Sequence, residues 1–171
     1  MDTIRDEMRV TKRTGQYEDI RFDKILKRVK TIGEEQDIKL GFSQLCLKVI
    51  DQLYDGIPTA KIDELMAEQC ASLVSDHPDY GRLAAAVSIS NLHKNTSSSF
   101  YETMKQLWTF SDINGVPTSL ISQDLWTVVN GNTQQLEDML DYKRDYLIDY
   151  FVSMDKLVDD VVTLTAILEY C

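Results

Sequence analysis

Residues that interrupt helices are scarce in this sequence. Seven glycines and three prolines make up only ten of its 171 residues. This share, about 6%, is roughly half of the usual one. So few breakers favour long helices and argue against a collagen-like chain, a low-complexity chain or an all-β fold with many turns. The hydrophobic fraction of 43% is high enough for a packed core, so we expect one globular domain with at most one appendage.

The first regular pattern in the chain is that of a β-hairpin. Apolar and polar side chains alternate over residues 8–12 and 17–22, and Arg13–Gln16 lie between them. Gly15 can adopt the positive φ that a tight reversal requires. After Phe22 the apolar spacing becomes helical, which predicts a helix capped by Asp23.

The same helical spacing predicts further helices along the chain. Ser43, Thr59 and Asp79 are residue types that cap helices, and Gly56 is expected to follow a helix end as a C′ glycine. The helix after Asp79 is expected to run past Ser97–Ser99 to about Phe110. Shorter helices are predicted near 120–129 and 132–144. The segment 154–170 has apolar residues at heptad-like spacing, but its Val and Thr content weakens helix propensity.

The charge of the chain limits its partners. The net charge of −10 weighs against binding to nucleic acid, which needs a basic surface. Residues 1–40 nevertheless hold 10 of the 18 basic side chains, so a phosphate-bearing ligand would bind there. The charged N-terminus does not resemble a signal peptide, and Leu83–Val87, the longest apolar run, is too short for a membrane span. Three cysteines without paired spacing (Cys46, Cys70 and Cys171) predict structural thiols and a cytoplasmic protein outside the membrane.

Cationic residues near the first helix form one candidate binding site. Lys12 and Arg13 lie at the hairpin end and Lys24 lies in the first turn of the helix. Helix N-termini carry free N–H groups and a partial positive charge, so these cations could hold a phosphate. Alone, the three residues fit a solvated basic face better than a phosphate site, because Lys and Arg are mostly exposed.

Two further groups of residues could complete such a site. Thr59 and Asp63 lie four residues apart on one helical face and could accept hydrogen bonds from a ribose or a base. Asn91, His93 and Lys94 follow one another closely, and Lys94 could reach a triphosphate. By themselves, these residues also fit an N-cap, an exposed aspartate and a surface lysine. A metal site is not expected, because His77 and His93 are the only histidines.

Four blocks of this sequence, in order, resemble an ATP-cone. They are residues 10–25, 54–65, 77–85 and 90–94. Together they are similar to the N-terminus of the class I ribonucleotide reductase large subunit of eukaryotes and their viruses, over residues 8–151. The resemblance implies a mainly α (α+β) fold in which a helical bundle is capped by a small β-hairpin sheet and followed by further helices. It also implies an ATP-cone at 1–98, a helical segment at 99–151 like the start of the reductase helical region, and a divergent tail at 152–171.

In that family the cone is the overall-activity site, where ATP supports deoxyribonucleotide synthesis and dATP stops it by changing subunit assembly. The resemblance therefore implies an allosteric ATP or dATP, with Mg²⁺, and no redox cofactor in this chain. Matching positions imply three roles in nucleotide binding. The phosphates would contact Lys12, Arg13, Lys24 and Lys94. The adenosine would lie against residues 18–22, with Thr59 and Asp63 near the base and the sugar. The set comprises Lys12, Arg13, Glu18, Asp19, Ile20, Arg21, Phe22, Asp23, Lys24, Thr59, Asp63 and Lys94.

The sequence departs from the family pattern at three places. Thr14 replaces the usual Asp or Asn before the hairpin glycine, and Ala86 replaces a usual Arg. From Val152 onward nothing resembles the stretch that leads into the catalytic barrel. We therefore expect a regulatory module without catalysis of its own. The alternatives are one half of a split enzyme, with a separately encoded barrel, or an interaction protein that modulates the assembly of reductase large or small subunits.

Overall fold

A computed structural model describes residues 8–147 of the chain. Its fold begins with the predicted hairpin, in which β1 (Arg9–Thr11) pairs antiparallel with β2 (Tyr17–Asp19). Gly15 closes the turn with φ +79°, and its N–H donates to the carbonyl oxygen of Lys12 at 2.8 Å. Thr14 therefore does not prevent the reversal, because the positive φ falls on the glycine.

A third strand, which the sequence pattern did not predict, completes the sheet. β3 (Ile57–Pro58) runs parallel to β1, with Val10 opposite Ile57. Gly56 lies in the turn before β3 rather than after a helix, with φ +79°, and its N–H donates to the Arg9 carbonyl oxygen at 2.8 Å. The predicted C′ role of Gly56 is therefore wrong.

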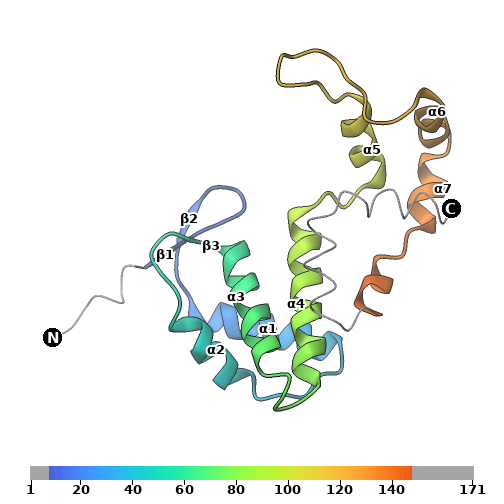
Figure 1. Cartoon of the computed structure of the whole chain (residues 1–171). Helices are drawn as coiled ribbons and strands as arrows, with labels where there is room; N and C mark the ends of the chain where they lie inside the picture. Colours follow the sequence, from blue (N-terminus) through green and yellow to red (C-terminus); the bar gives the residue numbers. More distant parts are fainter. Residues whose placement is uncertain (1–7, 148–171) are drawn as a thin grey trace. The chain divides into compact units, whose positions relative to one another are not determined.

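Four helices follow or flank this sheet, and Figure 1 shows α3 and α4 running side by side. Their bounds are α1 Phe22–Glu35, α2 Phe42–Ile50, α3 Thr59–Ser72 and α4 Asp79–Asn95. The predicted caps Asp23, Ser43 and Thr59 lie inside the helices, whose N-cap positions are Arg21, Gly41 and Pro58. None of these three positions makes a side-chain cap hydrogen bond. Asp23 instead binds Arg21 at 2.8 Å.

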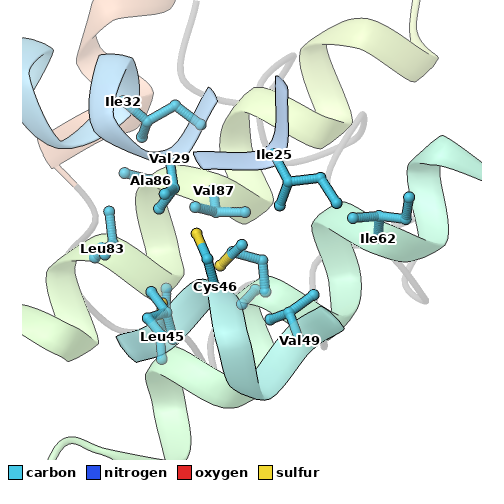
Figure 2. Close-up of a cluster of buried hydrophobic side chains, with 14 of the residues drawn as sticks. Ile25, Val29, Ile32, Leu45, Cys46, Val49, Ile62, Leu83, Ala86 and Val87 are labelled. Carbon is cyan, nitrogen blue, oxygen red and sulfur yellow. The ribbon is translucent and has the colours of Figure 1, made fainter. Parts of the chain in front are cut away.

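The core lies between these four helices and the sheet, as Figure 2 shows in part. Val49, Ile57 and Leu83 are completely buried. Ala86 is 4% exposed within the same cluster, so its small side chain fits where an arginine could not be solvated. Cys46 and Cys70 are buried free thiols, as predicted, and burial raises the pKa of Cys70 to about 12.

The chain divides into two compact units. The first extends through Asn95 and resumes at Asp145, and the second is Thr96–Arg144. The expectation that the fourth helix continues to about Phe110 is wrong, because Ser99 starts a new helix. Its Oγ accepts a hydrogen bond from the Glu102 N–H at 3.2 Å, which caps α5 (Phe100–Trp108).

Short helices follow α5 in the second unit, as predicted. They are α6 (Gln123–Gly131) and α7 (Thr133–Met139), and a 3₁₀ helix, η1 (Tyr142–Leu147), replaces the end of the predicted 132–144 helix. Trp126 stacks between Trp108 and Tyr101, with ring centroids 5.8 Å apart in each pair. The apolar segment 154–170 and the tail at 152–171 lie outside the described residues. No helix within residues 8–147 combines the length and the apolar character needed to cross a membrane.

Candidate functional site

The first unit contains a cavity of about 470 Å³ between the hairpin turn, α1, α3 and α4. This is the size of a typical small-molecule site. Its floor is apolar, with side chains such as Val29, Met66 and Val87. Its charged lining consists of five basic side chains and one acidic one, a formal charge of +4 in a chain whose net charge is −10. These side chains are Lys12, Arg13, Lys24, Arg28, Lys94 and Asp63.

A smaller cavity of about 190 Å³ lies along β2. Residues Glu18–Arg21 line it, and Lys12, Lys24 and Thr59 line both cavities. Ile25 and Ile62 also line both cavities, so the two spaces adjoin across a lining of two cations, one hydroxyl group and two apolar side chains. A ligand with a compact polar part and a highly anionic part could occupy both.

The sheet explains why residues far apart in sequence meet here. Because β3 pairs with β1, the start of α3 is held beside the hairpin that carries Lys12 and Arg13. Thr11 reinforces this pairing, since its Oγ1 donates to the carbonyl oxygen of Gly56 at 2.8 Å. Thr59, the first residue of α3, thereby reaches both cavities.

Arg28 is a cavity residue that the sequence reasoning missed. It lies four residues after Lys24 in α1, so both side chains lie on one helical face. That spacing could have indicated that Arg28 lies beside Lys24. Arg28 was not selected because it lies outside the four blocks that resemble an ATP-cone. Its guanidinium binds Asp63 with two hydrogen bonds, from Nε to Oδ1 at 2.8 Å and from Nη2 to Oδ2 at 2.9 Å.

Asp63 is the acidic centre of this cationic group. Its side chain is 8% exposed, and it also accepts a hydrogen bond from Nη2 of Arg13 at 3.3 Å. A nearly buried carboxylate needs such partners to offset the loss of its hydration. Both of its oxygens bind arginines, so Asp63 fixes the position of Arg13 and Arg28 at the cavity wall.

Arg13 also connects the hairpin turn to the end of α4. Its Nε donates to Oδ1 of Asn95 at 2.6 Å, and its Nη2 donates to Oδ1 of Asn91. Asn91 is itself buried at 8% exposure and donates to the carbonyl oxygen of Ala60 at 3.4 Å. These neutral amides orient Arg13, and the one carboxylate that pairs with it among the described residues, Asp63, is shared with Arg28.

Glu18 pairs with two of the lysines. Its carboxylate accepts one hydrogen bond from Lys24 through Oε1 and pairs with Lys12 through Oε2. These two ammonium groups lower the pKa of Glu18 to about 2. An anionic ligand that reaches Lys12 and Lys24 would therefore share or replace Glu18 as their partner.

Lys94 differs from the other cavity cations. Its backbone belongs to α4, but its ammonium group forms no hydrogen bond or ion pair with any side chain of residues 8–147. Burial lowers its pKa, and the nearby charges of Arg28 and Arg13 lower it further, although Asp63 opposes them. A partly desolvated ammonium group without a paired anion is a suitable partner for a phosphate oxygen.

The structure brings together most of the residues that the sequence predicted. Ten of the twelve line one or both cavities, and the exceptions are Phe22 and Asp23. Phe22 is 36% exposed at the start of α1, and the Asp23 carboxylate binds Arg21. Of the additional candidates, Asn91 orients Arg13, and Nε2 of His93 lies 2.7 Å from Oδ2 of Asp145.

Comparisons with known proteins agree with this geometry. Residues 8–95 match the ATP cone domain family. The chain is similar to ribonucleoside-diphosphate reductase large subunits, with 39% identity over 144 residues to that of Plasmodium falciparum (isolate Dd2) and 38% over 150 residues to that of Arabidopsis thaliana. Each alignment covers 84% of this chain and 18% of the relative. The chain thus spans about a fifth of the length of these curated relatives, in their N-terminal region.

Proposed function

Because the chain belongs to the ATP cone domain family, we propose that its adjoining cavities bind ATP or dATP as the allosteric module of a ribonucleoside-diphosphate reductase large subunit. The observation that carries this proposal is the group of five basic side chains that line the larger cavity, two of which, Lys12 and Lys24, also line the smaller one. In an acidic chain, such a local excess of positive charge is what a polyphosphate requires.

The two cavities suit different parts of the nucleotide. The triphosphate would contact Lys12, Arg13, Lys24 and Lys94, with Arg28 behind them. Base and sugar would lie in the smaller cavity, against the polar backbone and side chains of Glu18–Arg21 and beside Thr59. Mg²⁺ would arrive on the phosphates, since it commonly binds proteins through substrate phosphates and retained waters.

Thermal denaturation with and without ligand tests nucleotide binding. ATP or dATP at 100 times its dissociation constant should add about 2.7 kcal/mol of stability. For a unit of this size each kcal/mol corresponds to about 4–8 °C, so the melting temperature should rise by about 10–20 °C. Inorganic tripolyphosphate separates the contribution of the phosphates from that of the nucleoside. An unchanged melting temperature at millimolar ATP and dATP would contradict the proposal.

Two lysine variants locate the site. Lys94→Ala should weaken ATP binding by about 1.5–3 kcal/mol, the usual value of a hydrogen bond to a charged group. Lys105→Ala is the matched control, because Lys105 is a half-exposed lysine of α5 in the second unit and lines neither cavity. Equal ATP affinities for both variants, measured by calorimetry, would remove Lys94 from the site.

A second function, binding to reductase subunits, is favoured by apolar side chains exposed on the second unit. Ile113 is fully exposed at the tip of a loop, and Leu120 and Phe110 are 57% and 44% exposed. Two hydrogen bonds to Oδ1 of Asp112, from the N–H groups of Asn114 and Val116, order that loop. Co-purification with a reductase large or small subunit, lost in Ile113→Asp, tests this function.

A further inference from the structure

The last turn of α4 is held from two sides. On one side, Asn91 and Asn95 accept hydrogen bonds from Arg13 of the hairpin turn. On the other, Nε2 of His93 lies 2.7 Å from Oδ2 of Asp145 in η1. Residues 91 and 95 share one helical face, whereas residue 93 projects roughly 200° around the axis from residue 91. Lys94, which lines the cavity, lies within this doubly held turn.

The segment that carries Asp145 is itself anchored in the first unit. The ring of Tyr146 contacts His93 edge-on, with centroids 5.8 Å apart and planes at 89°. Tyr146 also packs against the hydrophobic core. The chain leaves the first unit after Asn95 and re-enters it at Asp145. The contact between His93 and Asp145 therefore joins the exit and the re-entry of the chain.

We propose that His93 and Asp145 are positioning residues of the nucleotide site, which hold Lys94 in the cavity by fixing the last turn of α4 to η1. The inference rests on the proposed nucleotide binding and extends it. It connects the nucleotide site to Asn95 and Asp145, the residues at which the chain leaves and re-enters the first unit.

Helix ends explain why such fixation is needed. The last four carbonyl groups of a helix lack partners within it, and terminal turns open readily. Lys94 lies in a partly desolvated position close to the like charges of Arg13 and Arg28. A free helix end would let the lysine turn towards water. The contact with Asp145 opposes this, because moving Lys94 out of the cavity would also displace His93.

Linkage then requires a reciprocal effect. If the contact between His93 and Asp145 raises the affinity for nucleotide, bound nucleotide must strengthen that contact by the same factor. ATP should therefore slow backbone hydrogen exchange in η1, although no residue of η1 lines either cavity. This protection should be absent in Lys94→Ala.

Calorimetric ATP titrations of matched variants test the proposal, at a temperature where circular dichroism shows each variant to be folded. His93→Ala and Asp145→Ala should each weaken ATP binding about fivefold or more. His93→Gln, which keeps a donor for Asp145, should bind more tightly than His93→Ala. In a Lys94→Ala background, His93→Ala should have little further effect, because both act through one group.

The control variant is His77→Ala. His77 precedes α4 at its other end and also lies beside an aspartate, with Nδ1 3.8 Å from Oδ2 of Asp79. The same substitution there should leave ATP affinity unchanged. If His93→Ala fails to fold, the ATP affinities of Asp145→Ala and His93→Gln are compared with that of the wild type instead.

Three outcomes would overturn the inference. Wild-type affinity in both His93→Ala and Asp145→Ala would refute it and leave the proposed function intact. A fully additive loss in the Lys94→Ala background would show that His93 acts elsewhere. Absence of ATP binding by the wild-type chain would refute the proposed function, and the inference with it.

Discussion

Asp63→Asn separates two roles that the same residue could have. The resemblance places Asp63 near base and sugar, whereas the structure shows its carboxylate bound to two arginines. Asparagine keeps the size of the side chain and removes its charge. The variant should therefore lose the ion pairs while the shape of the cavity is preserved.

The contacts of Asp63 set the size of the stability loss. Arg28 donates two short hydrogen bonds, at 2.8 and 2.9 Å, and Arg13 a longer one at 3.3 Å. A hydrogen bond to a charged group contributes about 1.5–3 kcal/mol. Both arginine side chains remain about a quarter exposed, at 26% and 28%, so water offsets part of the loss. We expect a loss of about 2–3 kcal/mol in total, or about 10–20 °C in the melting temperature of the first unit.

Anion binding should change in the opposite direction. Asp63 is the one acidic side chain that residues 8–147 contribute to the larger cavity, so its removal raises the formal charge of that lining from +4 to +5. Tripolyphosphate should therefore bind Asp63→Asn more tightly than it binds the wild type, most clearly at low salt. The assay pairs circular dichroism melting with calorimetric titration of tripolyphosphate and ATP. Wild-type stability, or weaker binding of tripolyphosphate, would refute the reasoning. Weaker binding of ATP alone would support a direct contact between Asp63 and the nucleoside.

Three further predictions concern the core, the second unit and pH. Leu83→Ala should lower the free energy of unfolding by about 2–5 kcal/mol in urea titrations, because Leu83 is completely buried. Ser99→Ala should cost about 1 kcal/mol by removing the cap of α5, and ATP affinity should not change, as calorimetry can verify. ATP affinity should fall as pH rises through the lowered pKa of Lys94, because only the protonated amine attracts phosphate; Lys94→Ala should lack this step in ATP titrations at increasing pH.

Local patterns accounted for much of the fold. The hairpin followed from alternation and one glycine, and the helices followed from apolar periodicity, because both signals act between near neighbours in sequence. Helix boundaries were less predictable. Ser97–Ser99 read as helix interior, but the Ser99 hydroxyl bonds the Glu102 N–H and begins a new helix. Residue preferences alone do not decide between these outcomes.

The residues of the candidate site were also predictable only in part. Lys12, Lys24 and Lys94 were identifiable from the sequence, because motif blocks and local charge marked them. Arg28 was not, since its role depends on Asp63, which lies 35 residues away. The partners of Asp63 arise only when β3 pairs with β1 and sets α3 beside the hairpin.

The sequence by itself determined the residue types available: a cation-rich first quarter in an acidic chain, helical periodicity and a glycine turn. Tertiary structure decided which of those cations face one another, which of them a carboxylate neutralises, and which one remains without a partner among residues 8–147. The physical reason is that local conformation depends on neighbouring residues. The charge and desolvation of a site instead depend on contacts between elements distant in sequence, here the hairpin, α1, α3 and α4.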